Sequence, residues 1–293
     1  MKIRKKFLEA YKNGINAVSG YGLTRNKFLK RSFETINSIA ITYLKESMVE
    51  IDGHKIFLDK KDSLRLSYNQ NYEIKELEII KNEINLGDKV IDVGANIGYH
   101  TLLFARLVGN SGKVYAFEPD PDNFQILKKN ILINRYDNVI LEQKAVSEKT
   151  EVLKLFRSEE NYGMHRIYQS KWCKDPINVN AIKLDDYFKN LNDINFIKMD
   201  IEGAEYGALQ GMKSIIENNK NLKIFTEFVP SSIIEYGIEP KKFLNFFLKN
   251  GFTILHVNSD KIIKDENQVD EFIKNYLDLD FVSNLLCRRI LEI

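Results

Sequence analysis

Glycine and acidic residues with a specific spacing lie between Lys89 and Asp120, in the run KVIDVGANIGYHTLLFARLVGNSGKVYAFEPD. A short apolar run containing Asp92 leads into the glycine-containing stretch 94–98, and a second apolar run ends just before Glu118. Glycines let a backbone turn tightly and approach a ligand closely. An acid at the end of a second strand is placed to accept hydrogen bonds from both hydroxyls of a ribose. The pattern therefore predicts a nucleotide-type site, and the alternative is a turn with a structural acid.

The spacing of this run favours one ligand. A dinucleotide fingerprint is G-x-G-x-x-G, whereas the sequence here is D-x-G-x-N-x-G, without the middle glycine. The charge of Asp92 would also sit poorly beside a pyrophosphate, but it suits an ammonium group. S-adenosylmethionine has an adenosine, an ammonium group and no phosphate, so we predict it as the cofactor and disfavour a nicotinamide-dependent oxidoreductase. The expected contacts are Asp92, Gly94, Asn96, Gly98 and Glu118.

Candidate groups for the chemical step follow two later apolar runs. A transfer reaction that takes a proton from its acceptor needs a positioned general base. Asp200 follows the run 195–199, Glu202 lies two residues further on, and Glu227 follows the run 222–226. His165 lies in a polar, aromatic-rich insertion, 157–172, that is suited to cover an active site. We predict Asp200, Glu202, His165 and Glu227 as catalytic residues. Asp200 has two further readings, as a ligand of the methionine end of the cofactor and as a helix cap.

Further contacts are predicted from position alone. Other cofactor contacts would come from the residue after the glycine loop, the start of the next helix and the end of the third strand: Tyr99, Asn123, Lys144 and Ala145. Tyr162 and Arg166 of the insertion are predicted to bind substrate. We expect His100 on a helix surface, and we expect no metal, although three acids near one edge are able to hold a hard cation.

The elements that must position these residues follow an alternating strand and helix pattern, which indicates an α/β fold with roughly seven core strands. The segment 48–58 alternates around Asp52-Gly53 and predicts a hairpin. Helices are expected over 72–84, 99–108, 122–135, 205–218 and 240–249. Core strands are expected over 90–93, 114–117, 139–142, 195–199, 222–226, 252–257 and 281–287, and two further extended runs over 151–156 and 179–184.

Composition limits the other functions. The chain has 293 residues and a net charge of +2, which gives no general argument for nucleic acid. Residues 1–31 hold nine Lys or Arg against one Glu, so a solvated basic arm or a peripheral membrane contact is expected there. Without a signal peptide or an apolar span, and with two widely separated cysteines, the sequence favours a cytoplasmic protein with reduced thiols. The N-terminal extension also leaves a homodimer open.

The runs VIDVGANIGYHTLL, FEPDPDNFQILKKNI, FIKMDIEGAEYGALQGM and VSNLLCRR resemble the FkbM family of S-adenosylmethionine-dependent methyltransferases, over about residues 50–290. The resemblance implies a class I methyltransferase fold, which is a Rossmann-like seven-stranded sheet of order 3-2-1-4-5-7-6. It would comprise residues 49–293, with 1–48 as a helical extension. Tyr72 and Glu73 match a Tyr-Glu pair of the family, which implies a place above the site and a contact with substrate.

The resemblance implies O-methylation of a hydroxyl on a sugar or a polyketide. We therefore expect a sugar O-methyltransferase of bacterial surface polysaccharide (capsule or O-antigen) assembly, with a glycan or a nucleotide-linked sugar as acceptor. The alternatives are methylation of a polyketide or another small molecule, and a catalytically idle scaffold that binds adenosyl ligands. An N-methylating or nucleic-acid enzyme is disfavoured, because Asp-Ile-Glu-Gly at 200–203 replaces the Asn/Asp-Pro-Pro-aromatic motif of many N-methylases.

Overall fold

The computed structural model describes residues 47–67, 69, 72–159, 161–170, 173–189, 192–276 and 282–289. The predicted N-terminal helical extension and its basic arm lie almost entirely outside the described residues. The extension therefore stays a prediction, as do the membrane contact and the homodimer.

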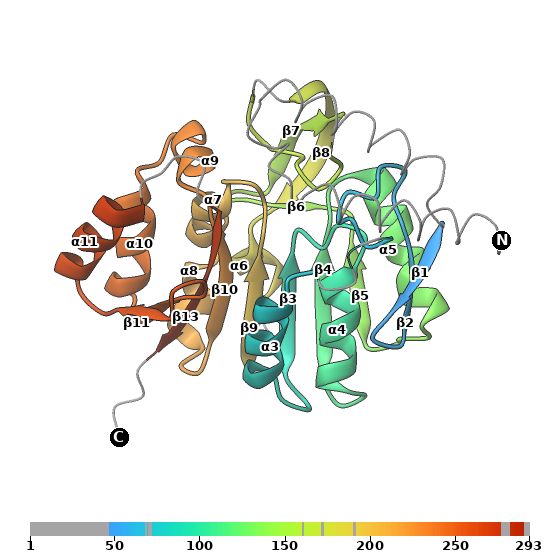
Figure 1. The fold of residues 1–293 in the computed structure, drawn as a ribbon, viewed down its shortest axis with the longest axis horizontal. Coiled ribbons are helices and arrows are strands. Elements are labelled where there is room, and N and C mark those ends of the chain that lie inside the picture. Colours follow the sequence, from blue (N-terminus) through green and yellow to red (C-terminus); the bar gives the residue numbers. More distant parts are fainter. Residues whose placement is uncertain are drawn as a thin grey trace, which may run out of the picture.

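An eight-stranded sheet forms the centre of the fold (Figure 1). Its order is β12-β11-β13-β10-β9-β3-β4-β5. The bounds of these strands are β3 Lys89–Val93, β4 Lys113–Phe117, β5 Val139–Glu142, β9 Ile194–Met199, β10 Lys223–Phe228, β11 Phe252–His256, β12 Lys261–Ile263 and β13 Ser283–Arg289. All neighbours from β5 to β10 are parallel, and β13 is antiparallel to both β10 and β11.

This order is that of a class I methyltransferase, as predicted, with one additional strand. Numbered along the chain without β12, it is 3-2-1-4-5-7-6. The additional strand, β12, pairs antiparallel with the outer side of β11. A three-residue strand is too short to show the alternation from which strands are predicted.

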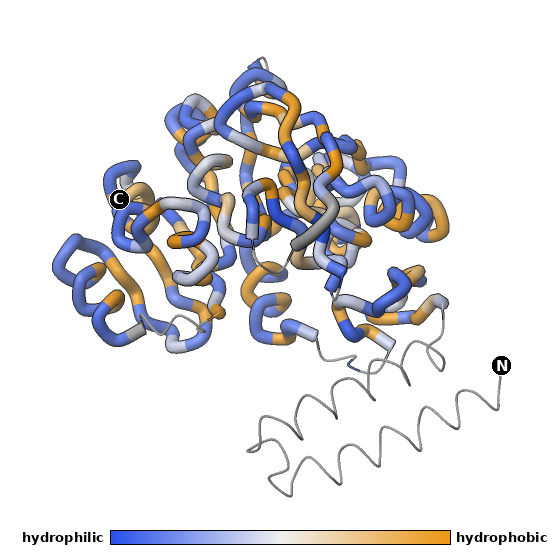
Figure 2. Tube along the Cα trace, turned by 90° about the horizontal axis from the view of Figure 1, so that it is seen from above, coloured by the Kyte–Doolittle hydropathy of each residue, from blue (hydrophilic) through white to orange (hydrophobic). Residues whose placement is uncertain are grey.

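Helices cover both faces of this sheet. On one face, α3 (Ile74–Glu83), α4 (Tyr99–Val108) and α5 (Pro121–Ile133) pack on alternate strand residues such as Val90 and Val114. The other face, with Ile91 and Val93, carries α6 (Leu184–Tyr187), α7 (Glu205–Gln210), α8 (Lys213–Asn218), α9 (Pro230–Glu235), α10 (Pro240–Lys249) and α11 (Glu266–Tyr276). Hydrophilic and hydrophobic segments alternate along the outer helices (Figure 2), as expected for helices with one buried side.

Two smaller sheets flank the main one (Figure 1). β1 (Met48–Ile51) and β2 (His54–Phe57) form the predicted hairpin, and β2 packs near α5. β6 (Ala145–Val146), β7 (Glu151–Ser158) and β8 (Cys173–Ile182) form a three-stranded sheet at the edge of the main sheet where β3 and β4 end. The predicted insertion, 157–172, begins with the last two residues of β7, and the rest of it lies in the connection from β7 to β8, over this edge.

Two local predictions were wrong. The single helix expected over 205–218 is interrupted at Gly211, where a Cβ atom would lie 2.2 Å from the carbonyl oxygen of Ser147. Close packing on a neighbouring loop therefore ends α7. The helix expected from Asp122 begins one residue earlier, and its N-cap is Asp120, whose carboxylate accepts from the backbone N–H groups of Asp122 and Asn123.

Candidate functional site

A pocket opens at the carboxyl ends of β3, β4 and β9, below the three-stranded sheet. Most of the predicted site residues line it: Tyr72, Gly94, Asn96, Tyr99, Glu118, Asn123, Lys144, Ala145, Tyr162, His165, Asp200 and Glu202. Predicted residues that do not line it are Asp92, Gly98, Glu73, Arg166 and Glu227. Lys198 and His100 line the pocket although neither was predicted to.

Glu118 organises one side of the pocket, which we call the cofactor side (Gly94, Asn96, Glu118 and Asn123). One carboxylate oxygen of Glu118 accepts from the Asn96 N–H at 2.8 Å, and the other accepts from the Asp120 N–H at 2.9 Å. Burial raises the pKa of Glu118 to about 8 in spite of these bonds. The carboxylate therefore holds the glycine loop and the start of α5 in one arrangement.

The glycine loop has little free space around it. Gly94 has a φ of +80°, and a Cβ there would lie 2.0 Å from the carbonyl oxygen of Asp200. Asn96 has a φ of +49°, in the left-handed region that Asn tolerates better than most residues. Any larger residue at position 94 would push the loop after β3 away from the loop after β9.

Two amide oxygens on the cofactor side are buried without a partner among the described residues. They are the Oδ1 atoms of Asn96 and Asn123. The Asn123 amide nitrogen is already used, since it donates to the carbonyl oxygen of Tyr162 at 2.8 Å. Buried acceptors normally find a donor. An adenosyl group with ribose hydroxyls and an exocyclic amine provides such donors, so the residues present fit this ligand.

Asp92 and Gly98 lie behind the pocket rather than in its wall. Asp92 is fully buried and accepts from the Thr101 hydroxyl at 2.6 Å. Gly98 is the N-cap of α4 with a φ of +91°, and a Cβ there would lie 2.6 Å from Leu127. Direct contact of these two residues with a cofactor is therefore not supported. Both instead fix the loop that makes the contacts.

Lys198 is the main site residue that sequence reasoning missed. The register pairs Lys198 of β9 with Asp92 of β3, and Asp200 follows two residues later on the same face. Lys198 is 5% exposed, and its Nζ atom lies 3.0 Å from an oxygen of Asp200. Burial alone would lower the pKa of Lys198, but the carboxylates of Asp200, Asp92 and Glu73 outweigh it and raise this pKa above its ordinary value. A lone lysine in the apolar run FIKM was the signal in the sequence.

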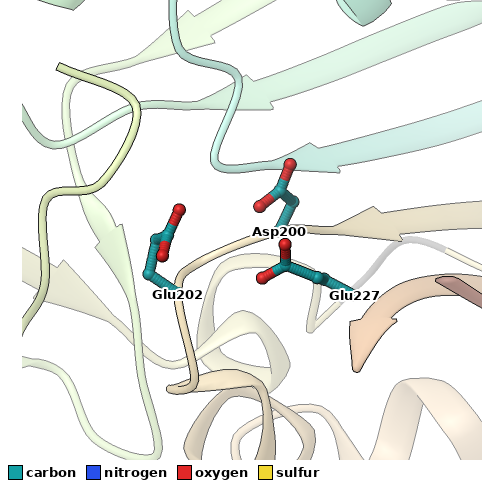
Figure 3. Close-up of side chains that lie close together, drawn as sticks. All are labelled: Asp200, Glu202 and Glu227. Atoms are coloured by element: carbon teal, nitrogen blue, oxygen red, sulfur yellow. The ribbon is translucent and has the colours of Figure 1, made fainter. Parts of the chain in front are cut away.

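Asp200, Glu202 and Glu227 bring their carboxyl groups together at the ends of β9 and β10 (Figure 3). One carboxylate oxygen of each lies within 4.8 Å of the other two. We call this group, together with Lys198, the acceptor side. Burial and, second, the neighbouring Asp200 raise the pKa of Glu202 to about 8, and the same two causes raise the pKa of Glu227 well above its usual range. Such a set of oxygens is also able to hold a divalent cation, so the prediction of no metal stays a prediction.

His165 lines the pocket, but its two ring nitrogens face protein groups. Nδ1 accepts from the Ser158 N–H at 3.0 Å, and Nε2 lies 3.6 Å from an oxygen of Asp120. Burial lowers the pKa of His165. Because the lone pair of the neutral ring is already engaged, this geometry does not support a base role, and His165 holds the insertion against α5.

Arg166, predicted to bind substrate, is buried behind the acceptor side. It contacts Glu235 of α9 at 2.6 Å and Glu202 at 3.5 Å. Its charge is thus shared between two carboxylates, and it joins the insertion to α9 and to the acid group. Tyr168 strengthens the same junction, since its hydroxyl donates to the carbonyl oxygen of Glu202 at 2.6 Å.

Glu73 and His100 form a pair at the N-terminus of α4. The Nε2 atom of His100 lies 3.2 Å from a Glu73 oxygen, and His100 is 8% exposed. The expectation that His100 lies on a helix surface was therefore wrong, because the segment before α3 covers this turn. Tyr72 reaches the pocket wall from the same segment, and its ring packs edge-on against Tyr99.

The strand order and this loop-and-acid arrangement define a class I methyltransferase. The sequence profile of the Methyltransferase FkbM domain matches residues 92–254, which is more than half of the chain. The chain belongs to the FkbM methyltransferase family, and S-adenosylmethionine is its cofactor.

Curated relatives share parts of the chain. A protein of Sulfurisphaera tokodaii named "Probable cobalt-precorrin-6B C(15)-methyltransferase (decarboxylating)" is 29% identical over 153 residues, 48% of this chain and 78% of its own length. A protein-L-isoaspartate O-methyltransferase of Methanococcus maripaludis is 30% identical over 118 residues, 35% of this chain and 56% of its own. The chain thus spans little more than half the length of this second relative.

Among solved structures, an FkbM methyltransferase of Methylobacillus flagellatus is similar with 18% identity and a TM-score of 0.42, covering 78% of this chain and 56% of that one. Within the described residues, no helix has both the length and the apolar character that a membrane crossing requires.

Proposed function

We propose that this methyltransferase transfers the methyl group to a hydroxyl oxygen of a sugar, in the assembly of bacterial surface polysaccharide. The observation that carries the proposal is the group of three carboxyls, Asp200, Glu202 and Glu227, on the acceptor side. Carboxyl groups accept hydrogen bonds from hydroxyls, and a sugar offers several hydroxyls at neighbouring positions. One acid can take the proton while the others orient the ring.

The cofactor supplies an electrophilic methyl group on a sulfonium, and the chain must supply position and a proton acceptor. Asp200 is best placed as that acceptor, because it lines the pocket at the end of β9 and the Nζ atom of Lys198, 3.0 Å away, holds its carboxylate in position. Glu202, whose pKa is raised to about 8, holds a proton near neutral pH and can donate a hydrogen bond to an acceptor oxygen. Glu227 does not line the pocket, but one of its carboxyl oxygens lies within 4.8 Å of Asp200 and Glu202 and completes the acid group. Tyr72 and Tyr162 line the same pocket and offer rings against which a sugar face packs.

The test is methyl transfer to a panel of hydroxyl compounds. Each reaction is monitored by the amount of S-adenosylhomocysteine that it releases. The panel contains methyl glycosides, a macrolide aglycone, an isoaspartyl peptide and a catechol. Each compound is assayed with EDTA and with Mg²⁺, which also shows whether the acid group needs a cation. The proposal expects turnover of at least one glycoside in excess of every other compound. If only the macrolide or the peptide is methylated, that compound replaces the sugar as the proposed acceptor. If no compound leads to release of S-adenosylhomocysteine although the cofactor binds, the result favours the idle scaffold.

A further inference from the structure

The basic side chains around the pocket already have partners in the protein. Four basic side chains line it, namely His100, Lys144, His165 and Lys198. Lys144 contacts Glu142 at 2.7 Å, and Lys198 contacts Asp200 at 3.0 Å. His100 and His165 face Glu73 and Asp120, as described above. Each basic side chain of the described pocket wall therefore has a carboxyl group of the protein beside it.

Further acidic groups lie beside these pairs. Glu202 lines the pocket and shares Arg166 with Glu235, and Glu227 lies within 4.8 Å of both Asp200 and Glu202. Arg157, at the base of the insertion, is engaged by Asp120 at 3.1 Å and also by Asp122. The acceptor side thus presents an excess of acidic groups, and no described cation of its wall is left to neutralise an incoming anion.

A phosphate group needs the opposite surroundings. Protein sites for phosphoryl groups place Arg, Lys or the N–H groups of a helix N-terminus around the oxygens. Like charges brought together in a partly buried site disfavour binding strongly. Uncharged hydroxyls, in contrast, can donate to ionised carboxylates and accept from protonated ones.

From this arrangement we infer that the acceptor unit in the pocket is a non-anionic polyol, an uncharged or amino sugar, and not a sugar phosphate or nucleotide-linked sugar. The inference rests on the proposed function and narrows it, because it excludes acceptors in which the methylated sugar carries a phosphate or a nucleoside diphosphate. It decides against the nucleotide-linked form that the sequence had left open.

The test compares matched forms of one sugar with the full chain. For each sugar that is methylated, kcat/KM is measured for the methyl glycoside, the 2-amino analogue and the 1-phosphate, with EDTA and again with Mg²⁺. We expect the 1-phosphate to be used at least about tenfold less well than the glycoside in both conditions. Equal use or preference for the 1-phosphate in either condition would overturn the inference.

A variant that removes one acid tests whether the acid group causes the weaker binding of the 1-phosphate. In Glu202→Gln the ratio of dissociation constants for 1-phosphate and glycoside should fall about three- to tenfold at pH 9, where the Glu202 carboxyl, with a pKa of about 8, is ionised. The ratio is measured by titration with S-adenosylhomocysteine present, so that activity is not needed. Glu271→Gln, an exposed acid bonded to Lys261, is the control and should leave the ratio unchanged. An unchanged ratio in Glu202→Gln at pH 9, in a variant that still binds S-adenosylhomocysteine, would contradict the inference.

Failure of the proposed function remains distinguishable. If the methylated compound is not a sugar, the sugar proposal fails, but the same comparison between that compound and its phosphate monoester still decides the charge inference.

Discussion

The cofactor side and the acceptor side of one pocket are built on different principles. On the cofactor side, Glu118 binds two backbone N–H groups, and the loop that it holds is one continuous run of sequence. On the acceptor side, Lys198 and Asp200 come from β9 and the residue after it, whereas Glu227 comes from β10. A partly buried ion pair with surplus acids there replaces backbone hydrogen bonds. The cofactor can be bound by a local sequence motif. The acceptor, in contrast, faces charged groups that only the packing of the folded chain brings together.

This difference predicts how each side fails. Removal of a group on the cofactor side should weaken binding of adenosyl ligands. Removal of a group on the acceptor side should leave that binding nearly intact and affect turnover, stability or pH dependence instead. The predictions below separate the two sides, beginning with the largest effect.

The largest effect is expected from Asp200→Asn. If Asp200 takes the proton from the acceptor, kcat should fall about 10²- to 10⁴-fold, because an amide has no basic oxygen of comparable strength. The dissociation constant for S-adenosylhomocysteine should change less than about threefold. Turnover with the best acceptor of the panel and calorimetric titration measure the two quantities. Near-normal turnover in this variant, together with a large loss in Glu202→Gln, would move the base to Glu202.

The next effect is expected from Lys198→Met, which should lower the free energy of unfolding because it leaves buried carboxylates without their cation. Breaking one partner of a buried pair typically costs about 3–5 kcal/mol. Urea unfolding should show a loss of this order, and Lys198→Arg should recover part of it. Lys213→Met, an exposed lysine at the start of α8, is the matched control and should change stability by less than about 0.5 kcal/mol. Equal stability of the two methionine variants would mean that Lys198 does not stabilise the acceptor side.

Glu118→Ala breaks the cofactor side. It removes an acceptor of the ribose hydroxyls and leaves the N–H groups of Asn96 and Asp120 without their partner, so S-adenosylhomocysteine should bind about 10- to 100-fold more weakly. Glu151→Ala, an exposed acid on β7, should bind as the wild type does. Calorimetric titration with S-adenosylmethionine, S-adenosylhomocysteine and NAD measures this. Binding of NAD in preference to the adenosyl ligands would refute the cofactor assignment.

The last prediction concerns pH. The pKa of Glu202 is raised by burial and by Asp200 from 4.5 to about 8, so its neutral form is the one that the folded state favours. The stability associated with this raised pKa is fully present below about pH 4.5 and is lost as pH rises to about 8. Glu202→Gln should therefore flatten the fall in unfolding free energy across this window, by up to about 1.4 kcal/mol per pH unit.

Urea unfolding between pH 5 and 9 on the ligand-free protein measures this slope. Parallel curves for wild type and Glu202→Gln would show that Glu202 ionises without opposition in the folded state.

The cofactor side could be predicted from the sequence because its residues lie in one short run of the chain. Glycines at fixed distances from Asp92 and an acid after the second strand predicted both the loop and the ligand class. The alternation of strands and helices indicated an α/β fold, and the resemblance to the FkbM family implied the order of the sheet. Where tight packing from afar intervened, local patterns failed. Gly211 ends a helix against the backbone of Ser147, and Gly98 packs on Leu127 instead of on a ligand.

The tertiary structure alone decided the charges. A lysine in an apolar strand, a histidine in a helix and an arginine in an insertion have no fixed partners along the chain. Register placed Lys198 beside Asp92, the segment before α3 covered His100 with Glu73, and α9 supplied Glu235 to Arg166. Strand and helix propensities act over a few residues, whereas an ion pair needs two groups that the chain keeps far apart until it folds. The sequence therefore determined the fold and the cofactor, and the folded structure determined which charges face the acceptor.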